Sequence, residues 1–188
     1  MEHDHSPEAI GQRLAGGPSA SYLRDWIYGG IDGAVTTFAV VSGVAGAGLP
    51  SSIIIILGIA NLIADGFSMA VSNFLGNRAE NQVMDKQGIS TGARKSSLRA
   101  AWVTMIAFVT IGSIPLLSFV TNWIVPGTIA NPFLWSSLLT GIAFFAVGAS
   151  KSRFVLQHWV LCGFETLAVG GIAASLAYVI GLVLESLV

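Results

Sequence analysis

Polar side chains recur at helical spacing along one apolar stretch of the chain. Residues 60–80 read "ANLIADGFSMAVSNFLGNRAE", in which Asn61, Asp65, Met69 and Asn73 follow one another at intervals of four, and Glu80 comes seven residues later. Side chains four apart share one face of a helix. The spacing therefore predicts a stripe of carboxylate, amide and thioether groups along which a partner helix would complete a polar track.

A second stripe lies earlier in the chain, in the segment "RDWIYGGIDGAVTTF". Asp25, Asp32 and Thr36 are seven and four residues apart, so they share one helix face. Gly29 and Gly33 leave space alongside them for a close neighbour.

Three acids fall inside long apolar runs, where a charged group costs about 3 kcal/mol on insertion scales. They are Asp32, Asp65 and Glu165, and no Lys or Arg is expected at comparable depth. A structural ion pair is therefore not predicted. A protonated acid, a bound cation or alternation between the two remain, so these three acids are the candidates for proton coupling.

The ligand types indicate which ion such a track would carry. Carboxylate and amide oxygens alone suit Mg²⁺ or Ca²⁺, whereas a thioether favours softer first-row ions. The candidate metal ligands are Asp25, Asp32, Asn61, Asp65, Met69 and Glu80. Alternatives stay open: Met69 is also a common core filler, Asp65 also suits a neutral acid bonded to another helix, and Glu165 also suits snorkelling to the interface.

The composition requires a membrane around these residues. Hydrophobic residues make up 53% of the 188 and charged residues 10%, and the mean hydropathy is +0.73. The runs do not alternate as β-barrel strands would. We predict an all-α integral membrane protein with five transmembrane helices, near Tyr28–Leu49, Ser52–Leu75, Ala100–Trp123, Phe133–Ala149 and Val155–Leu184.

Proline and glycine refine this expectation. Pro115 in the third predicted span predicts a kink. The 22 glycines of the chain are what close helix packing in a membrane uses.

The basic residues predict the topology. All nine Lys and Arg precede the first span or lie in the second-to-third and fourth-to-fifth connections. With five spans these regions share one side, so the positive-inside rule places the N-terminus in the cytoplasm and the C-terminus outside. We expect residues 1–27 to form a cytoplasmic tail with a short interfacial helix, and residues 28–188 to form the transmembrane domain.

Several function classes are disfavoured. Cys162 is the single cysteine, which excludes an intramolecular disulfide and a cysteine-rich metal site. His158 is the only histidine of the spanning region and has no nucleophile at helical spacing, so an intramembrane enzyme is not expected. We expect neither a resident cofactor nor a nucleic-acid partner.

The segments "RDWIYGGIDGAVTTFAVVSGVAGAGL" and "GIANLIADGFSMAVSNFLGNRAE" resemble the first two spans of the vacuolar iron transporter (VIT) family. This resemblance implies a five-span homodimer with its ion path at the dimer interface, exporting Fe²⁺ and often Mn²⁺ from the cytoplasm in exchange for protons. It maps the family's translocation aspartates onto Asp25 and Asp32 and its pathway methionine onto Met69.

The sequence departs from the better-known members at two places. Asn61 stands where they carry a Glu eight residues before the methionine, and Asp65 offers a carboxylate one turn later. Residues 81–98 are short and net basic, so the Glu-rich cytoplasmic metal-binding insert of those members is absent and this chain resembles the short-loop members.

These observations combine into one hypothesis. Fe²⁺ enters near Asp25 and Glu80, reaches a midplane site formed by Asp32 and Met69 of both subunits, and leaves on the outer side as protons replace it. A passive divalent-cation channel and a manganese-selective transporter are the alternatives. The short loops favour a bacterial inner membrane.

Overall fold

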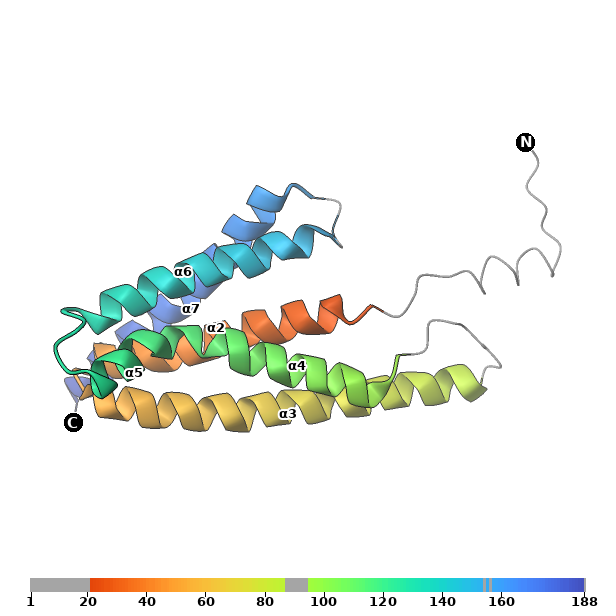
Figure 1. Ribbon diagram of the computed structural model, residues 1–188, viewed down its shortest axis with the longest axis horizontal. Coiled ribbons are helices and arrows are strands. Elements are labelled where there is room, and N and C mark those ends of the chain that lie inside the picture. Colours follow the sequence, from red (N-terminus) through yellow and green to blue (C-terminus); the bar gives the residue numbers. More distant parts are fainter. Residues whose placement is uncertain (1–20, 87–94, 154, 156, 188) are drawn as a thin grey trace.

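The computed structural model describes residues 21–86, 95–153, 155 and 157–187, and this part of the chain is all-helical (Figure 1). The elements are α2 (Leu23–Gly46), α3 (Ser51–Lys86), α4 (Ser97–Gly112), η1 (Ile114–Leu116), α5 (Leu117–Ile124), α6 (Pro132–Ser150), η2 (Lys151–Arg153) and α7 (Trp159–Glu185). With α4, η1 and α5 taken as one span, five helices of the described residues are long and apolar enough to cross a membrane. The predicted fold class is confirmed.

Several helix boundaries differ from the predicted ones. α2 begins at Leu23 rather than Tyr28, and α3 continues past Leu75 to Lys86. The extension of α3 contains neither glycine nor proline after Gly76, so nothing in the backbone ends the helix where the apolar run ends. The last helix begins at Trp159, later than expected. Residues 1–20 lie outside the described part, so the predicted interfacial helix and the boundary at residue 27 stay predictions.

α2 is the central helix and packs against α3, α4, α6 and α7. Two glycines allow its close contact with α4, because a Cβ on Gly29 would lie 2.6 Å from the carbonyl oxygen of Thr104, and one on Gly33 would strike the carbonyl oxygen of Phe108. The expected role of glycine in close packing is confirmed here. The contact brings Thr104 beside the first turns of α2.

The third span is broken at its proline, as predicted. α4 ends at Gly112 and the chain passes through the 3-10 turn that contains Pro115 before α5 begins. Proline has no N–H to continue the helical hydrogen bonds. The bend is bonded to α6, since the Ser136 hydroxyl donates to the Pro115 carbonyl at 2.6 Å and the Ser118 hydroxyl donates to the Pro132 carbonyl at 2.7 Å.

Many large apolar side chains lie on the surface of the bundle. The core is a small cluster around Phe38, Val41 and Phe144, whereas large side chains on α7 such as Ile172 and Leu176 are 62% and 60% exposed. Exposed apolar area of this extent marks a surface that faces lipid or another protein. The fold is therefore that of an integral membrane protein.

One end of the bundle carries the basic residues. The start of α2, the end of α3, the starts of α4 and α7 and the end of α6 lie at this end, and the C-terminus lies at the other (Figure 1). The described Lys and Arg belong to it: Arg24, Arg78, Lys86, Lys95, Arg99, Lys151 and Arg153. We call it the basic end.

Candidate functional site

The predicted polar stripe exists on α3 and is longer than expected. Its half-buried residues occur every fourth position: Asn61, Asp65, Met69, Asn73, Asn77 and Asn81. A fully buried row lies one position further on and includes Leu62, Gly66 and Ala70. Gly66 would place a Cβ 3.3 Å from Phe108, so this row packs against α4. The stripe therefore lies along the border between the packed side and the open side of α3.

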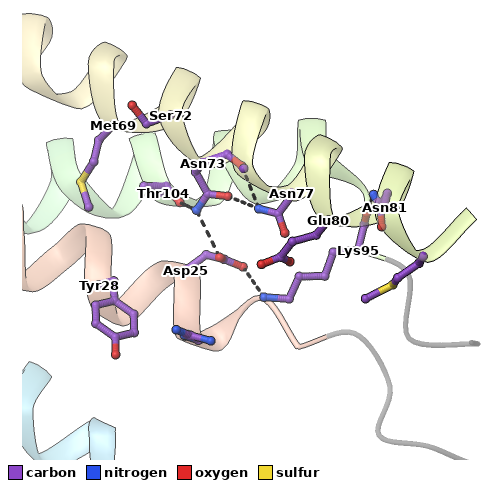
Figure 2. A pocket seen from close by; sticks show the side chains of 13 residues that line it. Asp25, Tyr28, Met69, Ser72, Asn73, Asn77, Glu80, Asn81, Lys95 and Thr104 are labelled. Atoms are coloured by element: carbon purple, nitrogen blue, oxygen red, sulfur yellow. Dashed lines mark hydrogen bonds and ion pairs between the residues drawn. The ribbon is translucent and has the colours of Figure 1, made fainter. Parts of the chain in front are cut away.

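A cavity of about 510 Å³ lies at the basic end between α2, α3 and the start of α4 (Figure 2). We call it the Asp25 pocket. The predicted ligands Asp25, Met69 and Glu80 line it, together with Asn73 and Lys95. Three of the six predicted metal ligands are thus brought to one cavity.

Asp25 is held by side chains from two other elements. Asn73 Nδ2 donates to Asp25 Oδ1 at 3.2 Å and to Thr104 Oγ1 at 2.8 Å. Lys95 Nζ lies 3.1 Å from Asp25 Oδ2. Asp25 is only 7% exposed, and a carboxylate so buried requires such partners.

The orientation of the Asn73 amide is fixed by its neighbour on the stripe. Asn77 Nδ2 donates to the Asn73 side-chain oxygen and, at 2.9 Å, to the Asn73 carbonyl. Because its oxygen accepts from Asn77, the Asn73 nitrogen is the atom that faces Asp25. The pocket thus holds the Asp25 carboxylate in one defined position.

The remaining wall of the Asp25 pocket supplies soft and hard ligands together. Met69 is half-buried, and the exposed Glu80 side chain points into the cavity (Figure 2). Carboxylate oxygens beside a thioether suit borderline first-row cations better than Mg²⁺ or Ca²⁺. Within the described residues, no three His, Cys, Asp or Glu side chains gather into one metal cluster, so the candidate ligands are distributed along the helices.

Asp32 and Asp65 form a second acidic group. Both are half-buried, their carboxylates interact electrostatically, and neither lines the Asp25 pocket. The Thr36 hydroxyl donates to the backbone oxygen of Asp32 at 2.9 Å and not to its carboxylate. Among the described residues, neither acid has a basic partner within ion-pair distance. Met69 lines the Asp25 pocket and Asp32 does not, so the midplane site of Asp32 and Met69 from both subunits stays a prediction.

Asn61 stands further along the stripe from the basic end. Its side-chain nitrogen is buried and, among the described residues, has no hydrogen-bond partner. An unsatisfied amide nitrogen of this kind is costly. Asn61 lies beyond Asp65 and does not line the Asp25 pocket, so its role as a metal ligand stays a prediction.

The expectation that Glu165 lacks a basic partner is wrong. Lys151 Nζ donates to Glu165 Oε2 at 2.7 Å, and the Glu165 side chain is 56% exposed. η2 follows α6 at the basic end and brings Lys151 back over the start of α7, a turn that residue spacing did not reveal. Glu165 lines a different cavity, of about 570 Å³, together with Arg24 and Tyr28.

Sequence reasoning missed three residues around Asp25. Asn77 continues the four-residue spacing from Asn73, so the stripe could have been followed one step further. Thr104 is a hydroxyl within an apolar run and carries only a weak signal. Lys95 had no sequence signal as a partner, because it is 70 residues from Asp25 in the chain.

Five apolar helices, a polar stripe and an acid-lined pocket at the basic end define a helical membrane transport protein. The sequence model of the VIT family matches residues 23–89 and 83–182. The chain belongs to this family.

Three relatives align with most of this chain. The vacuolar iron transporter of Toxoplasma gondii is 24% identical over 90% of this chain and 76% of its own length. The vacuolar iron transporter homolog 5 of Oryza sativa is 28% identical over 84% of both chains. The vacuolar iron transporter 1 of Arabidopsis thaliana is 24% identical over 87% of this chain and 86% of its own length. The protein is therefore a metal transporter and not an enzyme.

Proposed function

We propose that this protein exports Fe²⁺ from the cytoplasm, with Mn²⁺ as a second cargo. The observation that carries the proposal is the Asp25 pocket, in which carboxylates of Asp25 and Glu80 lie with the thioether of Met69 at the basic end. Such a ligand set suits first-row divalent ions. Relatives that align over most of the chain are named iron transporters, which supports the same cargo.

The route leads from the Asp25 pocket to the second acidic group and on toward Asn61. Asp32 and Asp65 are half-buried on a helix pair whose neighbouring surface is apolar. A partly exposed carboxylate pair in hydrocarbon needs a polar or hydrated environment. A second copy of the chain would supply it, so we propose a homodimer with the path between the two subunits and Met69 of both beside Asp32.

Proton antiport follows from the electrostatics of the second acidic group. Two neighbouring acids without a basic partner among the described residues repel each other in a low dielectric. A bound divalent ion relieves this repulsion, and protons relieve it when the ion leaves. Metal release and proton uptake are then one exchange, carried by Asp32 and Asp65. Glu165 is the weakest candidate for proton coupling because Lys151 already neutralises it.

We propose that the Asp25 pocket lies on the loading side of the membrane. The positive-inside rule assigns the basic end to the cytoplasm, so metal enters there and leaves at the end that carries the C-terminus. The family match divides into two segments at residues 83–89, which supports a short-loop member without the cytoplasmic insert. We propose the inner membrane of a bacterium as its location.

A passive cation channel would use the same stripe without proton coupling. To decide, the protein is reconstituted into liposomes that contain a metal-sensing dye and a pH probe, and Fe²⁺ or, in separate samples, Mn²⁺ is added outside under anaerobic conditions. Antiport predicts a dye response that needs the protein and protons that move opposite to the metal. Fe²⁺ flux without proton movement would establish a channel, and Mn²⁺ flux alone would establish a manganese-selective transporter.

A further inference from the structure

Lys95 lines the Asp25 pocket and pairs with Asp25. Its ammonium nitrogen lies 3.1 Å from Asp25 Oδ2, and the side chains of Lys95 and Asp25 are 24% and 9% exposed. The pair is thus largely removed from water, so it is stronger than an exposed ion pair.

The backbone that carries Lys95 is fastened to two other helices. Asn81 Nδ2 on α3 donates to the Lys95 carbonyl at 3.1 Å. The next residue, Ser96, donates its N–H to the Tyr22 hydroxyl at 3.1 Å and accepts from the Arg99 N–H as the N-cap of α4. The backbone of Lys95 is therefore held near Asp25, and the ammonium reaches the carboxylate on a flexible stem.

Both oxygens of the Asp25 carboxylate are engaged in this state. The Asn73 amide occupies Oδ1 and the Lys95 ammonium occupies Oδ2. Figure 2 shows the Lys95 ammonium beside the Asp25 carboxylate, while Glu80 points into the same cavity. A cation that approaches Oδ2 from the pocket competes with the ammonium for that oxygen and meets its positive charge.

We propose that Lys95 is a specificity-determining residue, a tethered monovalent cation that competes with incoming metal for Asp25. The inference rests on the proposed transport function, in which Asp25 receives the metal. A divalent ion interacts with Asp25 and Glu80 with twice the charge of an ammonium and displaces it. Na⁺ or K⁺ brings no such advantage, and lysine's flexible stem lets the ammonium swing away and return.

This competition has two consequences for transport. It raises the cytoplasmic metal concentration at which the pocket fills, and it keeps monovalent cations from occupying Asp25. A chain without a cytoplasmic metal-collecting insert would then still select divalent ions at the Asp25 pocket.

The test compares metal binding and transport in matched variants of the full chain. Mn²⁺ binding to the purified protein is followed by loss of the free-ion EPR signal, with and without NaCl, and flux is followed in liposomes. Lys95→Gln is expected to lower the Mn²⁺ Kd and the KM for flux about five- to tenfold, the equivalent of a partly buried ion pair. It also makes binding more sensitive to Na⁺.

Three controls separate local competition from general charge. Lys86→Gln removes the same charge at the exposed end of α3 and is expected to leave the Kd unchanged. Lys95→Arg keeps the charge and grips carboxylates with paired N–H groups, so its Kd is expected at or above the parent value. In an Asp25→Asn background, Lys95→Gln is expected to have no further effect.

The outcomes are distinct. An unchanged or higher Kd in Lys95→Gln, a lower Kd in Lys95→Arg, or a Lys95→Gln effect that persists in Asp25→Asn would each overturn the proposal. If no variant transports metal but Lys95→Gln binds Mn²⁺ more tightly in the parent background only, the transport function fails and the competitor role of Lys95 stands.

Discussion

Two aspartates seven residues apart on α2 occupy opposite environments. Asp25 is 7% exposed and bonded to Asn73 and Lys95. Asp32 is half-buried, interacts with the like charge of Asp65, and has no basic partner within ion-pair distance among the described residues. One helix face thus carries a satisfied carboxylate at its basic end and an unsatisfied one deeper in the bundle.

We propose from this difference that the two aspartates serve two steps of one path. A metal that reaches Asp25 competes with an existing partner, so this residue suits the proposed selective loading. A metal or proton that reaches Asp32 meets a charge that needs neutralising, so this residue suits the coupled exchange. The substitutions below test this division, from the largest expected effect to the smallest.

Removal of the Asp32 carboxylate is expected to abolish transport. Asp32→Ala and the isosteric Asp32→Asn both leave Asp65 without the second acid that a divalent ion and the exchanging protons require. Initial rates of metal and proton flux in liposomes measure the loss. Glu185→Gln, an exposed acid at the end of α7, serves as the control. Parent-like flux in Asp32→Asn would contradict the role given to Asp32.

Asp25→Asn is expected to slow loading without stopping the exchange. The amide keeps the shape of the carboxylate but loses its charge, so the KM for Mn²⁺ rises about tenfold, equivalent to about 1.4 kcal/mol, while the maximal rate falls less. Rates measured over a range of Mn²⁺ concentrations separate the two parameters. A loss confined to the maximal rate would place Asp25 in the exchange step and erase its contrast with Asp32.

Met69 is expected to change metal preference more than overall rate. Met69→Leu keeps the apolar volume and removes the thioether, whereas Met69→Ala removes both. We expect the Fe²⁺ to Mn²⁺ flux ratio to fall about threefold in each variant, because oxygen ligands alone favour harder ions. Competition between the two metals in one vesicle preparation gives the ratio. An unchanged ratio would make Met69 a packing residue.

Glu165→Gln is expected to have the smallest effect. The carboxylate is more than half exposed and paired with Lys151, and such pairs contribute about 1 kcal/mol or less. Flux and its proton stoichiometry should stay within about twofold of the parent. Loss of proton coupling in this variant alone would transfer the exchange step from Asp32 and Asp65 to α7.

The sequence predicted the fold because the bilayer imposes strong constraints on it. The number of spans, the bend at Pro115 and the gathering of the described basic residues at one end depend on local composition, and the structure agrees with each. Helix ends were less predictable. α3 continues past Leu75 to Lys86 because the chain beyond the apolar run still favours a helix, and hydropathy is blind to that preference.

The site was predicted only where helical periodicity reports it. The stripe from Asn61 to Asn73 depends on spacing within one helix, so the sequence contains it in full. The partners Lys95 and Thr104 depend on how α4 lies against α2, which is set by the glycine contacts at Gly29 and Gly33 and not by spacing along either helix. The pairing of Lys151 with Glu165 was not predicted for a similar reason, because it depends on how η2 turns the chain between α6 and α7.

α3 spaces the polar side chains of the proposed ion path at regular intervals. At about 1.5 Å per residue, its 36 residues extend about 54 Å, beyond the roughly 30 Å of a hydrocarbon core. Half-buried polar or thioether side chains recur on α3 every fourth residue, so successive side chains of the stripe are about 6 Å apart along the helix axis. An ion halfway between two successive side chains is about 3 Å from each, measured along the helix axis. In the proposed function, a partly dehydrated cation would therefore move by short transfers from one ligand to the next, and α3 would hold these ligands at a constant spacing.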